Sequence, residues 1–120
     1  MDDQASVAEL KRKVQSFCEA RNWDQFHNAK DLAIGILTEA CELLEHFRFR
    51  SGKELSKLVA NPSTRENIED ELADVLFFVL RFAQRFGIDL DEALIKKLEK
   101  NELRYPVGKA RGSNQKYTDL

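Results

Sequence analysis

Residues 31–47, DLAIGILTEACELLEHF, place apolar side chains around most of the circumference of a predicted helix. Residues 64–86, TRENIEDELADVLFFVLRFAQRF, repeat this pattern. A helix that is apolar on nearly every side is expected to be covered by neighbours on several of those sides. The two segments therefore predict a pair of antiparallel helices at the centre of the fold, joined by a polar connector.

Capping signals mark where further helices begin and end. Ser6 and Glu9 form a capping box at the start of one helix. Ser63 and Glu66 form a second box, and Gly87 suits the left-handed position that follows a helix. No alternating strand pattern of useful length occurs. The fold class is therefore predicted to be all-α, a four-helix bundle-like domain. The predicted helices cover residues 7–21, 31–47, 64–86 and 90–104.

The remaining segments are predicted to be connectors. Residues 22–30 are predicted to form an ordered loop rich in aromatic side chains, and residues 53–63 a polar connector with at most one short turn. Residues 107–120 are predicted to form an extended tail that is mobile when no ligand is bound. A chain of 120 residues has room for one domain, so residues 1–120 are predicted to form a single domain with this flexible C-terminal tail.

The composition argues against several functional classes. The formal net charge of −2 disfavours a nucleic-acid polymer or an anionic membrane as the main partner. No apolar run approaches the roughly 20 residues of a membrane span, and the acidic N-terminus has no signal-peptide pattern. A cytoplasmic location is therefore expected. Cys18 and Cys41 are expected to be buried free thiols.

Four acidic residues interrupt the two most apolar helices. The first helix carries Glu39 and Glu42, three residues apart. The second carries Glu71 and Asp74 at the same spacing. That spacing places the members of each pair on one helix face, one turn from each other. Antiparallel packing of the two helices is expected to bring all four carboxylates together.

Clustered carboxylates in apolar surroundings need a counter-charge, because burial and like charges both disfavour ionisation. Carboxylate oxygens without Cys, and without His at a helical ligand spacing, select Mg²⁺, with Mn²⁺ as a substitute. Two alternatives remain open. The acids can pair with Lys or Arg of neighbouring helices. A di-iron carboxylate bundle needs Glu-x-x-His motifs, which neither helix has, since His46 lies one residue beyond the required spacing.

The order E-x-x-E, spacer, E-x-x-D resembles the signature of the MazG-like all-α nucleoside triphosphate pyrophosphohydrolases. Three further stretches resemble the dCTP pyrophosphatase subgroup of that family: RNWDQFH at residues 21–27, KNELRYP at residues 100–106 and KYT at residues 116–118. The resemblance covers roughly residues 7–120. It implies Mg²⁺-dependent hydrolysis of a dNTP, with dCTP as the first candidate, to the monophosphate and pyrophosphate.

The resemblance also implies roles for individual residues. Glu39, Glu42, Glu71 and Asp74 would hold Mg²⁺. In the hydrolysis that the resemblance implies, Glu39 is the acid expected to polarise the attacking water. Substrate-binding residues would come from the aromatic loop, the two central helices, the last long helix and the tail. They are Trp23, Asp24, Gln25, Phe26, His27, Phe49, Phe78, Asn101, Arg104, Tyr105, Lys109, Arg111 and Lys116.

Three positions depart from the pattern of the subgroup. A Trp is expected where this chain has Phe49, and a Tyr where it has Phe78. Val14 stands where a substrate-contacting His can occur. Phe still stacks on a base but lacks the polar group of Trp or Tyr. These changes leave the acidic motifs intact. Because they remove polar groups that would select the base, tolerance for dATP, dTTP or modified dCTP is expected.

Members of the family form tight helical dimers, or tetramers built from two dimers, so the resemblance implies a homo-oligomer. The alternative function is a non-catalytic helical dimerisation or adaptor module that retains the fold. The complete set of acids, Asn101 and the cations of the tail favours the enzyme. Phe77, Phe78 and Phe82 are expected in the core or at a dimer seam. Arg81 and Arg85 are expected to be exposed, in ion pairs of little energetic weight.

Overall fold

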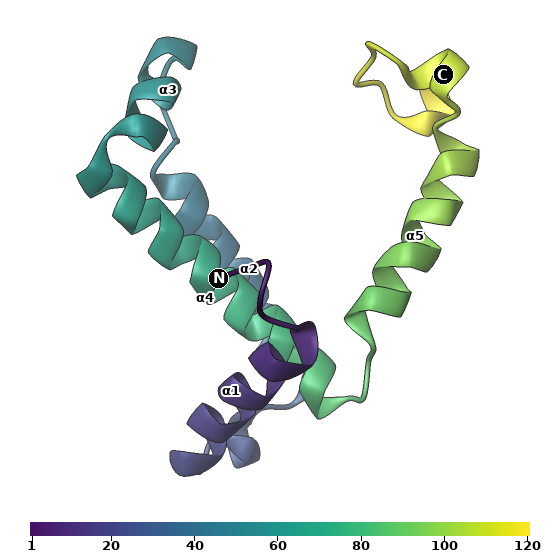
Figure 1. The fold of residues 1–120 in the computed structure, drawn as a ribbon. Coiled ribbons are helices and arrows are strands. Elements are labelled where there is room, and N and C mark those ends of the chain that lie inside the picture. Colours follow the sequence, from purple (N-terminus) through teal and green to yellow (C-terminus); the bar gives the residue numbers. More distant parts are fainter. The chain divides into compact units, whose positions relative to one another are not determined.

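The computed structural model describes residues 1–120 and contains only helices. The predicted all-α class is confirmed. Four α-helices occupy the four predicted segments, and Figure 1 shows them together with the short helices between and after them. The long helices are α1 (Val7–Ala20), α2 (Ala29–Glu45), α4 (Pro62–Arg85) and α5 (Leu90–Arg104). The short ones are η1 (Asp24–Phe26, a 3₁₀ helix), α3 (Gly52–Ala60), α6 (Val107–Ala110) and η2 (Tyr117–Asp119, a 3₁₀ helix).

The chain divides into two compact units, Met1–Gly87 and Ile88–Leu120. In the first unit α4 is the central element, because α1, α2 and α3 all pack against it. Figure 1 shows α2 and α4 side by side, with α3 at the end where the chain turns from one to the other. The most extensive packing is between α2 and α4, the two helices that carry the acidic motifs.

A glycine allows α2 and α4 to approach closely. A Cβ built on Gly35 of α2 would lie 2.5 Å from Cε1 of Phe78 of α4, closer than real Cβ contacts come. The ring of Phe78 therefore lies directly on the backbone of α2. Gly35 is one turn before Glu39 in α2, and Phe78 is one turn after Asp74 in α4. The close contact is therefore next to the acidic motifs and keeps the two helices near each other there.

The structure corrects the predicted connector between the two central helices. Residues 52–60 form α3, with Ser51 as its N-cap accepting a hydrogen bond from the backbone of Glu54. Leu55 and Leu58 are half-buried, which places an apolar edge in a segment predicted to be polar. The predicted capping box at Ser63 is also wrong. α4 starts at Pro62, which suits the first helical position, and Asn61 caps it by accepting from the backbone of Ser63.

Few side chains are fully buried in the first unit, so the two apolar helices are not covered within one chain on as many sides as expected. The buried apolar residues are Cys18, Leu32, Leu80 and Ala83. Leu37 of α2 is 65% exposed and Leu72 of α4 is 56% exposed. An apolar groove of about 420 Å³ runs along α4, lined by Leu72, Ala73, Val75, Leu76, Val79 and Glu69. Both cysteines are free as expected, but Cys41 is exposed.

The second unit consists of α5 and the folded tail. Asp89 caps α5 by accepting a hydrogen bond from the backbone of Glu92. The tail is not extended throughout, because α6 and η2 form within it. Tyr117 of η2 makes an edge-to-face contact with Tyr105, at 5.9 Å between ring centroids, and lies 4.9 Å from the guanidinium carbon of Arg104. The tail therefore folds back on the end of α5.

No helix in either unit is long and apolar enough to cross a membrane. The single-domain organisation and the mobility of the tail remain predictions.

Candidate functional site

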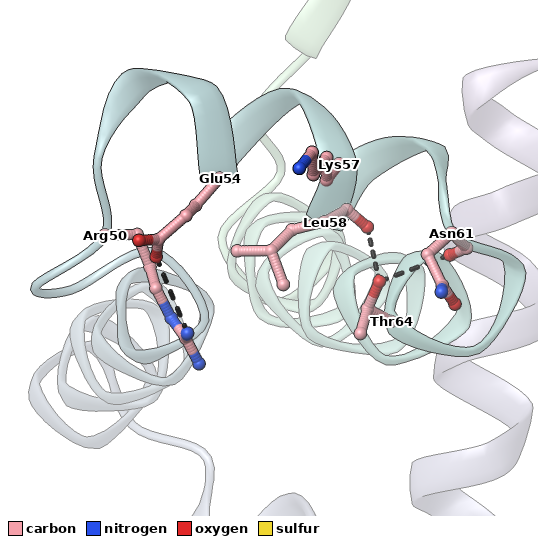
Figure 2. Close-up of a pocket in the computed structure, with 6 residues that line it drawn as sticks. All are labelled: Arg50, Glu54, Lys57, Leu58, Asn61 and Thr64. Atoms are coloured by element: carbon pink, nitrogen blue, oxygen red, sulfur yellow. Dashed lines mark hydrogen bonds and ion pairs between the residues drawn. The ribbon is translucent and has the colours of Figure 1, made fainter.

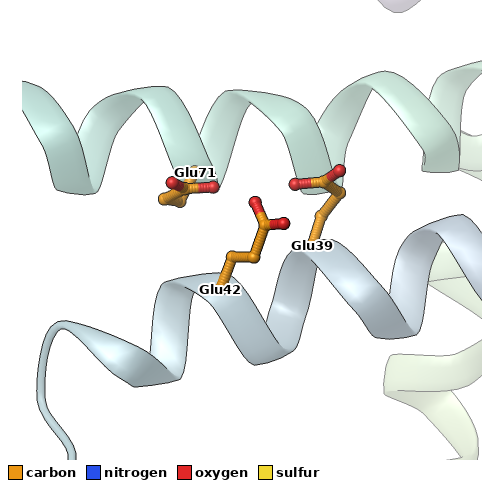
Figure 3. Close-up of side chains that lie close together, drawn as sticks. All are labelled: Glu39, Glu42 and Glu71. Atoms are coloured by element: carbon orange, nitrogen blue, oxygen red, sulfur yellow. The ribbon is translucent and has the colours of Figure 1, made fainter.

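Three carboxylates meet between α2 and α4. Oxygen atoms of Glu39, Glu42 and Glu71 all lie within 4.8 Å of one another. Figure 3 shows Glu39 and Glu42 rising from one helix toward Glu71 on the other. The three-residue spacing on α2 places its two acids on the face that meets α4. The juxtaposition expected from the two motifs is therefore present for these three side chains.

Burial and mutual repulsion raise the proton affinity of this cluster. Loss of water around Glu39 is the main reason that its pKa rises to about 7, with further contributions from a hydrogen bond to Glu42 and from the charges of Glu42, Asp74 and Glu71. Desolvation is also the main cause that raises the pKa of Glu71, followed by the hydrogen bond and charge of Glu42. Ionising the cluster therefore needs a positive charge close by.

Two carboxylate oxygens in the cluster lack any partner. Oε2 of Glu39 and Oε2 of Glu71 are buried and accept no hydrogen bond. A buried carboxylate oxygen without a donor is costly, and no Lys or Arg forms an ion pair with any of the three acids. Pairing with Lys or Arg, the alternative left open by the sequence, therefore does not occur in this chain.

Asp74 and His46 lie at the margin of the cluster. Asp74 is exposed and does not belong to the set of oxygens within 4.8 Å, although its charge raises the pKa of both Glu39 and Glu71. Nε2 of His46 lies 3.9 Å from Oε1 of Glu71. His46 was interpreted from the sequence only as a possible di-iron ligand, and its contact with Glu71 was not predicted. Its signal was weak, because His46 follows the end of α2 and its position depends on the turn there.

The donor set fits a hard divalent cation. Three carboxylates supply only oxygen, the ligand type that Mg²⁺ and Mn²⁺ prefer. The two oxygens without partners would gain the interaction they lack. Three acids from two helices leave other coordination positions for water and phosphate oxygens, which is how Mg²⁺ is usually bound in phosphoryl-transfer sites.

The aromatic loop is joined to the acidic helices by a series of ring contacts. The rings of His27 and Trp23 lie 6.0 Å apart, and Trp23 lies 5.7 Å from Phe17 of α1. Phe17 contacts Phe77 of α4 at 5.9 Å, and Phe77 contacts Phe78 at 5.3 Å. All four contacts have the edge-to-face geometry favoured by aromatic quadrupoles. The series ends at Phe78, one turn from Asp74, so loop and acids are parts of one packed unit.

Arg81 corrects an expectation from the sequence, because its side chain is completely buried. Its Nε donates to Nδ1 of His27 at 2.8 Å, its Nη1 donates to Oε1 of Gln84 at 2.6 Å, and its Nη2 donates to Oδ1 of Asp24. Arg85 is partly exposed and lies 3.7 Å from Oδ2 of Asp24. Hydrogen bonds from Arg81 therefore attach Asp24 and His27 of the aromatic loop to α4. The carboxylate of Asp24 pairs with the guanidinium groups of both Arg81 and Arg85.

The other residues predicted to contact the base are more exposed. Gln25 donates to the backbone carbonyl of Asn22, and Phe26 is exposed. Phe49 is 90% exposed, with the guanidinium carbon of Arg48 4.6 Å from its ring centroid. Phe49 also has a positive φ of 63°, an unusual conformation for a bulky residue. An exposed aromatic ring on a strained backbone suits a contact that forms with a ligand.

The residues predicted to bind the triphosphate belong to the second unit. Arg104 precedes Tyr105 and lies against the ring of Tyr117, and Lys116 directly precedes Tyr117 in the sequence. Asn101 is one turn before Tyr105 on α5, and its backbone carbonyl accepts the hydrogen bond from the backbone N–H of Tyr105. Lys109 lies in α6, and Arg111 follows it. The contacts of Tyr117 with Tyr105 and Arg104 thus place η2 of the tail against the end of α5.

A separate pocket of about 230 Å³ lies between α3 and the start of α4. Figure 2 shows its lining residues, Arg50, Glu54, Lys57, Leu58, Asn61 and Thr64. Several of its polar side chains bond within the protein. Arg50 pairs with Glu54 at 3.6 Å, and the Thr64 hydroxyl donates to the backbone carbonyl of Leu58. It contains no clustered acids, so the three-carboxylate cluster is the stronger candidate for the functional site.

Comparison with known proteins shows the family of the chain. The sequence model of the MazG-like family matches residues 34–120, a stretch that contains all three clustered acids and Asp74. The chain belongs to the MazG-like family. It is 36% identical to the rat dCTP pyrophosphatase 1 over 115 residues, which cover 96% of this chain and 68% of the rat protein. The human dCTP pyrophosphatase 1 is 33% identical over the same length and coverage.

A solved structure shares the fold. The crystal structure of a pyrophosphatase from Archaeoglobus fulgidus superimposes with a TM-score of 0.78 and 36% sequence identity, covering 83% of this chain and 92% of that chain. This MazG-like chain therefore shares both sequence and fold with pyrophosphatases. The similarity to the two mammalian proteins extends through residues that the family match does not include, among them the aromatic loop.

Proposed function

We propose that this chain hydrolyses a deoxynucleoside triphosphate, dCTP in the first place, to the monophosphate and pyrophosphate, with Mg²⁺ as the cofactor. The observation that carries the proposal is the cluster of Glu39, Glu42 and Glu71, with two buried carboxylate oxygens that have no partner. Membership of the MazG-like family and the similarity to pyrophosphatases identify the chain as a nucleoside triphosphate pyrophosphohydrolase. The identity of the base, the deoxyribose sugar and the Mg²⁺ cofactor are what we propose beyond that activity.

Glu39, Glu42 and Glu71 would hold the metal, with Asp74 completing the set from the margin of the cluster. When bound, Mg²⁺ neutralises charge on the triphosphate and aligns its phosphates. The protein contributes the shape of the site, because the Gly35–Phe78 contact holds α2 and α4 close enough for acids of both helices to meet. Mn²⁺ would substitute, since it takes the same oxygen ligands.

Glu39 is the proposed proton acceptor for the attacking water. In the metal-free cluster, desolvation and the neighbouring acids raise its pKa to about 7. A bound cation would favour the ionised carboxylate, which is the form that accepts a proton. As the water oxygen bonds to the α-phosphorus, one water proton passes to Glu39. The bond from the α-phosphorus to the bridging oxygen breaks, and pyrophosphate leaves with that oxygen.

The nucleoside would be bound by the aromatic loop and by two exposed or half-buried rings. Trp23, Asp24, Gln25, Phe26 and His27 form the proposed loop part of the pocket. Phe49 and Phe78 supply apolar ring faces without the polar group of Trp or Tyr, which supports stacking on several bases rather than strict selection of cytosine. dATP, dTTP and modified dCTP are therefore proposed as secondary substrates.

The triphosphate would be bound by the polar and cationic residues of the second unit. Asn101, Arg104, Tyr105, Lys109, Arg111 and Lys116 are the proposed residues. Their role is to offset the negative charge that develops on pyrophosphate as it leaves. The folding of Tyr117 against Tyr105 and Arg104 supports this assignment, because it brings Lys116 to the end of α5.

A homo-oligomer, either a dimer or a tetramer built from two dimers, is part of the proposal. The single chain leaves Leu37, Leu72 and Leu76 exposed, together with the apolar groove along α4. A groove this apolar on the central helices is expected to be covered in solution. A helical adaptor module would use the same surface, but nothing in such a role accounts for the unpaired acids.

The proposal is tested with a panel of dNTPs and NTPs and detection of pyrophosphate. We expect turnover with Mg²⁺ or Mn²⁺, pyrophosphate rather than inorganic phosphate as the product, and the highest kcat/KM for dCTP. Chelation of divalent cations is expected to abolish turnover. Release of inorganic phosphate, or equal turnover after chelation, would contradict the proposed reaction. Binding of no nucleotide at all would favour the adaptor.

A further inference from the structure

One charged side chain of the molecule is completely buried, and it belongs to Arg81. All three guanidinium nitrogens are used: Nε by His27, Nη1 by Gln84 and Nη2 by Asp24. The partners on the aromatic loop are 54 and 57 residues away in sequence. A buried guanidinium is stable only when its donors are satisfied, and here each nitrogen has an acceptor.

The contact with His27 determines where the imidazole proton resides. A guanidinium has five N–H donors and no acceptor, and it does not lose its proton in proteins. Nδ1 of His27, 2.8 Å from Nε of Arg81, must therefore act as an acceptor. A neutral imidazole has one acceptor nitrogen and one donor nitrogen. The proton of His27 is consequently on Nε2, the nitrogen that Arg81 does not contact.

The surroundings also keep His27 neutral. Burial is the main cause that lowers its pKa, and the charges of Arg81 and Arg85 lower it further, against the opposing charge of Asp24. Asp24 itself is held by both arginines, and the hydrogen bond from Arg81 is the main cause that lowers its pKa. The two arginine charges and the hydrogen bond from Arg81 thus both favour the neutral imidazole of His27.

We propose that Arg81 is a positioning residue that fixes His27 as the Nε2–H tautomer, so that His27 offers the nucleotide a hydrogen-bond donor and no acceptor. The complementary group is an acceptor on the nucleoside, such as a base carbonyl oxygen or an unprotonated ring nitrogen. This inference rests on the proposed function, because His27 is assigned there to the nucleoside pocket. A lysine cannot replace Arg81, since one ammonium nitrogen cannot reach His27, Asp24 and Gln84 in the fork geometry of a guanidinium.

The tautomer is measured directly by ¹⁵N NMR of the side chain of His27 in the wild-type protein. We expect Nδ1 to resonate as an unprotonated ring nitrogen and Nε2 as a protonated one near neutral pH. A protonated Nδ1 would overturn the inference. This measurement needs no variant and no substrate, so a folding defect in a variant does not affect it.

The functional consequence is measured with Arg81→Lys, with Arg85→Ala as the matched control. Arg85 also pairs with Asp24 but makes no hydrogen bond to His27. Arg81→Lys is expected to raise KM for the preferred nucleotide about tenfold, the size of one lost hydrogen bond, with kcat within a few-fold of wild type. It is also expected to populate both tautomers of His27. Arg85→Ala should leave Nδ1 of His27 unprotonated, because Arg81 still donates to it.

The outcomes separate this inference from the proposed function. A wild-type protein that turns over no nucleotide contradicts the proposed function, whereas the NMR result still reports the tautomer. An active Arg81→Lys enzyme with wild-type KM and an unprotonated Nδ1 on His27 contradicts the positioning role alone. A fall in kcat with unchanged KM contradicts it as well, because a donor to the nucleoside acts on binding.

Discussion

Helix α4 carries two charged groups in opposite states. Near its middle, Glu71 meets two acids of α2 and has a buried oxygen without a partner. Ten residues later, Arg81 is completely buried with every nitrogen bonded. Both charges lie in an apolar helix, where an isolated ion would be strongly destabilising. Only the arginine has its counter-charge and its acceptors within the chain.

The presence or absence of partners distinguishes a structural charge, Arg81, from a candidate binding site, the cluster around Glu71. A charge whose partners are complete stabilises the arrangement that holds it, and its removal leaves other groups unpaired. A cluster of like charges without partners destabilises the chain by itself and gains stability when a cation binds. The acids are therefore the candidate metal site, and Arg81 is the device that positions the loop beside it.

The largest expected effect is on turnover by Glu71→Gln. The substitution removes one charge from the cluster while keeping the side chain's size, so we expect kcat/KM to fall roughly a hundredfold or more in the presence of Mg²⁺. The measurement is pyrophosphate release at saturating metal. Glu45→Gln is the matched control, because Glu45 lies one turn from Glu42 on α2, is 62% exposed and pairs with Arg48. Normal turnover by Glu71→Gln would exclude the metal assignment.

Substitutions of the two charged residues are expected to change stability in opposite directions. Arg81→Met removes the bonded guanidinium and is expected to lower the free energy of unfolding by about 1–3 kcal/mol. Glu71→Gln removes repulsion and is expected to raise the melting temperature of the metal-free protein. Thermal unfolding in the presence of a chelator measures both. A lower melting temperature for both variants would contradict the view that Glu71 destabilises the metal-free protein while Arg81 stabilises it.

The close approach of α2 and α4 is tested by Gly35→Ala. Alanine normally stabilises a helix interior by up to about 1 kcal/mol relative to glycine. Here the new Cβ would overlap the Phe78 ring, so we expect a net destabilisation of about 1–2 kcal/mol and weaker metal binding. Denaturant unfolding measures the first effect. Gly108→Ala is the control, since nothing lies within 4 Å of its added Cβ.

The last expected effect is the pH dependence of the metal-free protein. The pKa of Glu39 rises from its ordinary value of 4.5 to about 7 on folding, so the folded state binds this proton more tightly than the unfolded state. Stability from this group is present below pH 4.5 and is lost as the pH rises to about 7. Melting temperatures across this interval should therefore decline, and Glu39→Gln should reduce the decline. An equal decline in the variant would assign it to other groups.

Patterns within single helices predicted most of the fold. The E-x-x-E and E-x-x-D spacings placed three carboxylates correctly on the facing sides of α2 and α4, because helical periodicity alone determines which face a residue occupies. The start and end of α5 followed from local signals of the same kind. The aromatic loop was recognised by composition, although its η1 turn was not.

Long-range partners and short helices were harder to predict. Arg81 looked like a surface ion pair, because its partners are more than 50 residues away and no local pattern indicates them. α3 was missed although Leu55, Leu58 and Val59 have helical spacing, because the segment is only nine residues long and lies between Gly52 and Pro62. The exposure of Leu37 and Leu72 was not foreseen, since periodicity shows that a face is apolar but not which chain covers it.

Calorimetric titration of Mg²⁺ into the nucleotide-free protein tests the central claim most directly. The three-acid cluster predicts binding of Mg²⁺ near neutral pH with release of protons, because Glu39, whose pKa is raised to about 7, must ionise to serve as a ligand. It also predicts that both the heat and the proton release disappear in the Glu39→Gln, Glu71→Gln double variant. Mg²⁺ binding of the same affinity in the double variant, or no binding to the wild type with or without a non-hydrolysable dNTP, would contradict the account.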